Sequence, residues 1–294
     1  MNSYGAKQFG IFRIILGVYL TVHFLMLIPF AADTFSNQGQ LPQANLNLTY
    51  GFFPNILNTL DSPVQVEIFL GVLTMLSLAF TLGLNRRLMA LLLWYGWAAL
   101  FNRNNLISNP GIPFVGFLLL LTVFVPATEA FSLRERRENE EFKISPVLYY
   151  GAWLLMATGY MVSGLDKLNS PSWLNGDAIP LVLDLPLARD WFLRDLVAGL
   201  PTPVLRAHTW GVLALEIGFP LLALWRRTRF LAWLLMTGMH CGILLMVDFA
   251  DLTLGMLMIH VFVFDARWLG RGFMAKIAAR LPRARLATES PGRT

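Results

Sequence analysis

The chain has 294 residues, of which 56% are hydrophobic and only 14% are charged, and its mean hydropathy is +0.56. This balance departs from that of an ordinary soluble domain and indicates a protein whose solvent is mostly lipid. The formal net charge of +5 is explained by membrane topology and anionic lipid, so it does not indicate nucleic-acid binding.

Eight apolar runs divide the chain. A helix needs about 20 apolar residues to cross the hydrocarbon core, where a backbone without internal hydrogen bonds is too costly. We therefore predict an all-α, polytopic integral membrane protein. The predicted spans are 9–30, 64–84, 88–102, 112–127, 146–165, 207–225, 229–247 and 252–268. The fourth span is short and bracketed by Pro113 and Pro126, so we expect it to tilt, extend into its flanks or be covered by its neighbours.

Basic residues are distributed unevenly between the two sides of these spans. Of the 23 Lys and Arg residues, 18 lie near the chain ends or at the second, fourth and sixth of the segments that connect consecutive predicted spans. The other five are Arg103, Lys167, Arg189, Arg194 and Arg206. Because Lys and Arg are enriched in cytoplasmic loops, we predict cytoplasmic termini, with the long segments 31–62 and 166–206 outside.

The chain reads as one membrane domain followed by a short tail. No internal repeat and no Gly/Ser-rich linker divides residues 1–270. In the basic tail 271–294, apolar residues from Phe273 to Leu281 fall on one helical face, which predicts a helix lying on the cytoplasmic membrane surface. A similar pattern at 189–200 predicts an outer amphipathic helix that roofs a cavity between the spans.

Four ionisable side chains fall inside predicted spans. They are Glu216, near mid-membrane, and His23, His240 and His260, at central or outer depths. Such groups are expensive in lipid unless they face a partner, the bundle interior or water, so each is a candidate functional residue. Two interpretations stay open: a set that relays protons or binds a quinone or a metal, and a set that only bonds neighbouring helices together.

A second polar group lies at the predicted outer ends of the spans. Arg103, Asn104 and Asn105 follow the third span, and Lys167 ends the fifth. An ammonium at the edge of an apolar cavity is poorly solvated and can act as a base. The competing interpretation is that Lys167 extends to the lipid headgroups, as most interfacial lysines do.

Several kinds of site have no signature in the chain. We find no hydrolase elbow, no phosphate loop and no di-histidine metal motif, so no metal ligand is assigned. The single cysteine, Cys241, excludes an internal disulfide and a cysteine-based zinc cluster. Because it lies in an apolar run, we expect its thiol to be buried.

The segment Tyr160–Gly176 reads YMVSGLDKLNSPSWLNG. It resembles the segment of vitamin K-dependent gamma-carboxylases in which a Gly-Leu-x-Lys-Leu run is followed by Trp and Gly. Residues 102–111, residues 216–229 and His240 with the last span resemble the bacterial branch of that superfamily, the HTTM (horizontally transferred transmembrane) proteins. The resemblance extends over roughly residues 9–270.

This resemblance implies a function. Lys167 corresponds to the base that deprotonates vitamin K hydroquinone, which implies a quinone or hydroquinone cofactor and a site that faces outward, in a bacterial inner membrane. We therefore take Lys167 as the candidate catalytic residue. The candidates for orienting a quinol-like lipid are Arg103, Asn104, Asn105, Glu216 and His240.

The chain also departs from the carboxylase pattern. Carboxylases carry a functional histidine directly after an Asn-Asn pair, whereas Leu106 follows Asn105 here. The chain ends soon after the last span, without the large extramembrane domain that receives glutamate substrates. We therefore do not expect full carboxylation of protein glutamates. The alternatives are a quinol-handling core, a site that has lost its chemistry, a maturation factor for a secreted peptide, and a non-catalytic subunit or scaffold of a larger membrane complex. A transporter is disfavoured because no inverted repeat is visible.

Overall fold

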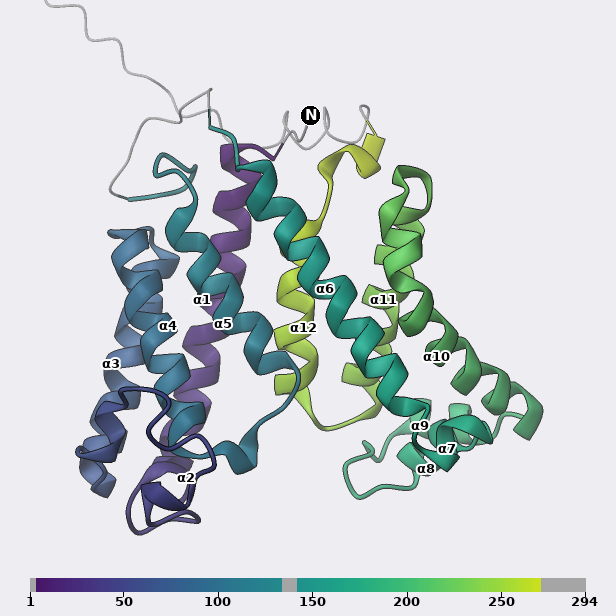
Figure 1. Ribbon diagram of the computed structural model, residues 1–294, viewed down its shortest axis with the longest axis horizontal. Helices are drawn as coiled ribbons and strands as arrows, with labels where there is room; N and C mark the ends of the chain where they lie inside the picture. Colours follow the sequence, from purple (N-terminus) through teal and green to yellow (C-terminus); the bar gives the residue numbers. More distant parts are fainter. Residues whose placement is uncertain (1–3, 134–141, 271–294) are drawn as a thin grey trace, which may run out of the picture. The chain divides into compact units, whose positions relative to one another are not determined.

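The computed structural model describes residues 4–133 and 142–270. Within these ranges the chain is helical and contains no β-strand; an isolated antiparallel bridge pairs Ala188 with Val247. Eight α-helices of 14 to 23 residues form the described bundle (Figure 1). They are α1 (Ala6–Leu27), α3 (Pro63–Thr81), α4 (Arg86–Arg103), α5 (Gly111–Phe124), α6 (Pro146–Lys167), α10 (Thr202–Leu224), α11 (Arg226–Met246) and α12 (Ala250–Val263).

Shorter helices connect the long ones. The short α-helices are α2 (Ala31–Phe35), α7 (Pro171–Leu174), α8 (Ala178–Leu183) and α9 (Phe192–Ala198). The 3₁₀ segments are η1 (Ile28–Phe30), η2 (Ala44–Leu46), η3 (Ile56–Asn58), η4 (Asn105–Ile107) and η5 (Ala266–Leu269). The bundle ends at Phe264, and the described residues after it, 265–270, belong to a separate unit. The predicted amphipathic tail, 271–294, lies outside the described residues.

The helices confirm the predicted class, an all-α membrane protein. In the described part of the chain, four helical segments are long and apolar enough to cross a membrane: Ala6–Phe35, Pro63–Thr81, Thr202–Leu224 and Arg226–Met246. Helices α5 and α12 are apolar but shorter, as the short fourth run predicted for α5. Each predicted span coincides with one long helix. The predicted end of the eighth span at residue 268 is wrong, because α12 ends at Val263.

Prolines and caps set several of these helix boundaries. Pro63 and Pro146 occupy first-turn positions, where the missing backbone N–H is not needed. At the start of α3, Ser62 and Gln65 form a reciprocal capping box. After α1, Pro29 begins a tighter 3₁₀ turn, so the chain leaves the helix near Leu27. These local signals explain the end of α1 and the starts of α3 and α6.

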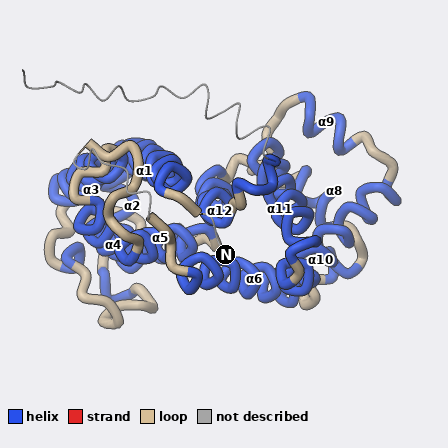
Figure 2. Tube along the Cα trace, turned by 90° about the horizontal axis from the view of Figure 1, so that it is seen from above, coloured by secondary structure: helices blue, strands red, loops and turns tan. Residues whose placement is uncertain are grey.

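Helix α12 lies at the centre of the bundle and contacts α1, α5, α6 and α11 (Figure 2). Successive long helices run in opposite directions (Figure 1). Consequently the start of α1 lies beside the end of α12, where Gln8 Nε2 donates to the Phe264 carbonyl at 2.6 Å. At the other end, His23 of α1 meets Asp251 of α12, with 2.7 Å between Nδ1 and Oδ1.

Side chains that donate to backbone carbonyls fasten the helices to one another. Trp97 of α4 donates to the Ile112 carbonyl at 3.0 Å, Tyr149 of α6 to Val263 at 2.9 Å, and Trp233 of α11 to His260 at 2.9 Å. Indole and phenol groups suit this position because the ring packs as an apolar body while the N–H or O–H finds a partner. Each bond therefore stabilises a contact between neighbouring helices without exposing a polar group to lipid.

The outer faces of the bundle are apolar and exposed, which fits contact with lipid. Helix α11 shows this clearly, because its buried residues are Ala232, Met236 and His240, one narrow stripe at four-residue spacing. Cys241 follows that stripe by one residue, a rotation of about 100°, and is exposed. The expected burial of its thiol is therefore wrong. Helix α9, in the segment expected to form an outer amphipathic helix, contacts α8 and α11.

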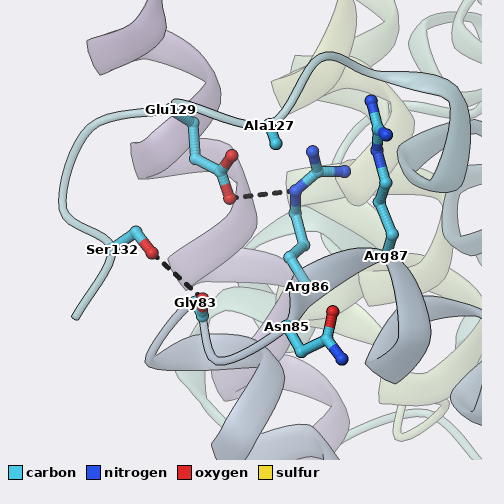
Figure 3. A pocket seen from close by; sticks show the side chains of 7 residues that line it. All are labelled: Gly83, Asn85, Arg86, Arg87, Ala127, Glu129 and Ser132. Carbon is cyan, nitrogen blue, oxygen red and sulfur yellow. Dashed lines mark hydrogen bonds and ion pairs between the residues drawn. The ribbon is translucent and has the colours of Figure 1, made fainter. Parts of the chain in front are cut away.

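Two buried arginines share one carboxylate near the start of α1. Arg86 Nε donates to Glu129 Oε1 at 2.9 Å (Figure 3), and Arg13 Nε lies 3.4 Å from the same oxygen. Further donors of Arg86 contact the carbonyls of residues 122, 125 and 126 at the end of α5. Arg86 and Glu129 line a cavity of about 260 Å³ together with Gly83, Asn85, Arg87, Ala127 and Ser132.

Arg13 extends the same cluster to the end of α3. Its guanidinium donates to the carbonyls of Phe80 and Thr81, at 3.0 and 2.5 Å, and to Phe131 at 2.8 Å. Carbonyl groups at helix ends have no intrahelical partner and carry partial negative charge, so they compensate the guanidinium. Arg13 and Arg86 thus join α1, α3, α4 and α5, whereas the sequence analysis had used them only as basic residues that indicate topology.

Glu129→Gln tests this cluster. The substitution removes the carboxylate that the two buried guanidinium groups share, and breaking a buried pair costs about 3–5 kcal/mol. We expect a marked loss of stability, measured as thermal unfolding of the purified protein in detergent. Glu67→Gln, at an exposed position of α3, is the matched control and should unfold at the parental temperature. Equal stability of the two variants would contradict a role for the shared carboxylate.

Candidate functional site

One face of α6 carries the residues of the site. Tyr160, Ser163, Gly164 and Lys167 follow one another at three- and four-residue spacing, which places them along one side of a helix. Tyr160 and Gly164 are buried. Lys167 is the last residue of α6, so its side chain lies where the bundle interior meets the connecting segment.

Lys167 is held in an ion pair. Its Nζ donates to Glu216 Oε2 of α10 at 2.6 Å and to Ser163 Oγ at 2.7 Å. The ammonium also lies 5.0 Å from the centre of the Trp173 ring, within range of a cation–π attraction. The Lys167 side chain is 21% exposed and that of Glu216 only 6%. The lysine therefore points into the bundle, and each charge compensates the other.

Gly164 allows the two helices to approach closely enough for this pair. A Cβ at Gly164 would lie 2.7 Å from Ile217 Cγ1, 3.0 Å from the Ile217 backbone nitrogen and 3.1 Å from Glu216 Cβ. Backbone and Cβ atoms of α10 cannot move aside without moving the helix. The absence of a side chain at residue 164 therefore sets the separation of α6 and α10, and with it the reach of Lys167.

Deeper along α6, Tyr160 joins two histidines from different helices. Its hydroxyl lies 2.8 Å from His240 Nε2 of α11 and 2.6 Å from His260 Nε2 of α12. His260 Nδ1 lies 3.1 Å from Thr237 Oγ1. His240 Nδ1 is buried and has no hydrogen-bond partner among the described residues. The contacts of the Tyr160 hydroxyl show that the two buried histidines converge, which the sequence left open.

Proton counting gives this cluster two states. The Tyr160 hydroxyl donates to one imidazole and must accept the Nε2–H of the other. When it donates to His260, the proton on His260 Nδ1 is donated to Thr237, and His240 Nδ1 is a free lone pair. In the opposite state, His240 Nδ1 carries a proton without an acceptor. The two states differ only in proton positions, and in both of them His240 Nδ1 has no partner among the described residues.

Phe219 connects the two parts of the site. It lies one turn after Glu216 on α10, and its ring centre is 4.9 Å from that of Tyr160. The ion pair and the tyrosine–histidine cluster thus form one polar face between α6, α10, α11 and α12. We call it the α6 polar face.

The site residues predicted after the third span lie at the end of α4 and make contacts outside the α6 polar face. Arg103 is fully buried, and its guanidinium donates to the carbonyls of Leu41 and Pro42 at 2.7 and 3.3 Å. Asn104 Nδ2 donates to the Thr34 carbonyl at 2.7 Å. Asn105 begins η4. The hydrogen bonds of Arg103 and Asn104 hold α2 and the segment after it against the end of α4; none of them reaches Lys167 or Glu216.

A family model confirms the resemblance noted in the sequence. The HTTM domain model matches residues 2–268, which is nearly all of the helical bundle. The chain belongs to the HTTM family. No curated protein and no solved structure matches it. In this HTTM protein, the ion pair described above joins Lys167, from the Gly-Leu-x-Lys-Leu motif, to Glu216 of α10.

Gly164→Ala tests the close approach of α6 and α10. An added methyl group must push α10 away, and overpacking of this kind costs about 1–3 kcal/mol. We expect lower thermal stability. The matched control is Gly151→Ala on the same helix, where a Cβ would meet nothing within 4 Å. Alanine there should be neutral or stabilise the helix by up to about 1 kcal/mol. Similar effects of the two substitutions would argue against a special contact at Gly164.

Tyr160→Phe tests the shared hydroxyl. Its removal leaves two buried imidazole nitrogens without their partner, and an unsatisfied buried polar group costs about 1–3 kcal/mol. The expected result is a lower unfolding temperature. Tyr150→Phe, on the exposed side of α6, provides the control and should leave the unfolding temperature unchanged. Parental stability of Tyr160→Phe would show that the histidines do not depend on the hydroxyl.

Proposed function

We propose that this HTTM protein binds the headgroup of a quinol-like lipid at the α6 polar face. Lys167 and Glu216 would exchange protons with the headgroup, and His240 would hold it by a hydrogen bond. The observation that carries the proposal is the buried polar cluster that ends at His240 Nδ1, a nitrogen without a partner in the described part of the chain. Buried polar atoms in native proteins normally have a partner, so this atom calls for a ligand.

The residues at this face fit a quinol. A quinol hydroxyl both donates and accepts, so it suits His240 Nδ1 in either proton state. The Trp153 ring stacks on Phe219 at 6.1 Å, and its Nε1 is a second buried donor without a partner among the described residues. Aromatic walls with few polar groups are typical of cofactor sites. An aromatic ligand with oxygen atoms on its ring matches this composition.

The chemistry of the chain's own residues is proton transfer. A bound quinol supplies ionisable hydroxyls and, on oxidation, electrons. In the ion pair the proton is on Lys167; its transfer to Glu216 leaves a neutral amine that can accept a proton from a nearby hydroxyl. Tyr160 can carry a proton between His240 and His260. Arg103, Asn104 and Asn105 enter as positioning residues, since their segment closes the same end of the bundle.

We further propose that the end with Lys167 faces outward and that both termini are cytoplasmic, in a bacterial inner membrane. The excess of basic residues at the opposite end supports this orientation. The alternation of eight helices supports it too, because an even number of crossings returns the chain to its starting side. An outward site would be open to lipid quinols and to secreted substrates, including a small peptide.

Quinol binding can be tested with a short-chain naphthohydroquinone. Titrated under argon into the protein in maltoside micelles, it should bind saturably, and Lys167→Ala should weaken binding by about tenfold or more, equivalent to 1.4 kcal/mol. Lys143→Ala, at an exposed position before α6, is the control and should bind like the parent. Equal binding by Lys167→Ala, or no saturable binding by the parent, would remove the proposal.

The second candidate is a non-catalytic subunit of a larger membrane complex. It is favoured by the ion pair itself, since Glu216 already compensates Lys167, and by the exposed apolar residues Phe192 and Leu196 on α9. Purification from native membranes separates the candidates. A stoichiometric companion chain without bound quinone would support the subunit, whereas co-purified quinone on a lone chain would support the quinol site.

A further inference from the structure

A cavity of about 450 Å³ lies where the end of α1, the loop between α4 and α5, and the start of α12 meet. This volume is in the range of small-molecule sites. Its wall includes His23, Asp251, Asn109 and three phenylalanines, Phe30, Phe101 and Phe249. Lys167, Glu216 and His240 are not among the lining residues. The cavity is therefore a different place from the α6 polar face, and we call it the Asp251 cavity.

Its polar wall is the pair formed by His23 and Asp251. His23 Nδ1 and Asp251 Oδ1 are 2.7 Å apart, and the His23 ring packs on Trp97 with 4.9 Å between ring centres. His23 Nε2 is enclosed and has no partner among the described residues. In a neutral His23 ring with its proton on Nδ1, that N–H donates to Asp251 and the enclosed Nε2 carries no hydrogen. The carboxylate then gives the cavity its charge.

The Asp251 carboxylate has room for a second partner. Its side chain is 38% exposed, and the bond to His23 uses one oxygen. Asp251 lies in the first turn of α12, where the helix dipole favours a negative charge. Among the described residues that line the cavity, none is Lys or Arg. The cavity therefore offers no cation to an anionic ligand, whereas a cationic group would compensate the negative charge of the Asp251 carboxylate.

The remaining walls also suit a cation. Phe30, Phe101 and Phe249 come from three separate segments and line the same cavity. The face of an aromatic ring attracts a positive charge, and ligand ammonium groups are recognised by carboxylates together with such rings. Leu27, Leu106 and Ile107 supply apolar surface, and Phe30 and Leu106 are exposed at 60% and 68%. A ligand with an ammonium head and an apolar body matches this arrangement.

We propose that the Asp251 cavity binds an organic ammonium compound, with the ammonium at Asp251 and the apolar body against the phenylalanines. The site is independent of the proposed quinol function, because it uses other residues and another part of the bundle. Asn109, whose Oδ1 accepts from the Gly111 backbone at 2.9 Å, shapes the wall beside the carboxylate.

The test compares three ligands that differ in charge. The probes are 4-phenylbutylamine, 4-phenylbutanol and 4-phenylbutyrate, each titrated into the protein in maltoside micelles by calorimetry, with protein-free micelles as the blank. We expect the amine to bind saturably at one site per chain and about tenfold or more tighter than the alcohol, with the carboxylate weakest. An alcohol that binds as tightly as the amine, a carboxylate that binds tightest, or no saturable amine binding overturns the proposal.

Variants locate the amine on the chain. Asp251→Asn should reduce amine binding by about tenfold and leave alcohol binding unchanged; unchanged amine binding contradicts the proposed contact. Asp248→Asn is the matched control, since Asp248 is exposed, pairs with Arg189 and does not line the cavity. If Asp251→Asn does not fold, Phe249→Leu should weaken amine binding relative to alcohol binding, and equal effects on both ligands overturn the proposal. Lys167→Ala should keep amine binding, which separates this result from a failure of the quinol proposal.

Discussion

The carboxylate that Arg13 and Arg86 share is the contact on which half of the bundle depends. A guanidinium cannot be left in a membrane interior without compensation, so Glu129 and the carbonyl groups at the ends of α3 and α5 must lie where they do. This fixes the ends of α1, α3, α4 and α5 relative to one another. Helix α12 then packs against α1 and α5 and presents its other side to α6 and α11.

The need to compensate a buried charge also applies between α6 and α10, at the end of the bundle where Lys167 lies. Lys167 enters the bundle only because Glu216 compensates it, and Glu216 reaches it only because Gly164 lets α6 and α10 approach. Each polar residue between these helices can therefore have a structural role, a chemical role or both. Where its hydrogen bonds are complete, as at His260, a structural role is sufficient to explain it. Where a buried atom has no partner among the described residues, as at His240 Nδ1, a ligand could supply one.

Sequence reasoning predicted some of these features and missed others for physical reasons. Glu216, His240 and His260 stood out because charge and imidazole are rare in apolar runs. Tyr160 did not, because tyrosine is common in such runs and its role appears only when two other helices bring histidines to it. Glu129 lies in the gap after the fourth predicted span, and nothing local connects it to Arg13, which is far away in the chain. The role predicted for Asn104, orienting a ligand, stays a prediction, and the sequence did not indicate that its side chain donates to the Thr34 carbonyl.

By itself, the sequence determined the all-α membrane class, the position of each long helix and the HTTM family, because hydropathy, proline positions and the Lys167 motif are properties of contiguous residues. The tertiary structure alone decided that Lys167 pairs with Glu216, that Tyr160 joins two histidines, and that His23 and Asp251 share a cavity. Each of these contacts depends on the separation and rotation of helices distant in the chain. Helix packing sets both, through side-chain volumes at many positions at once.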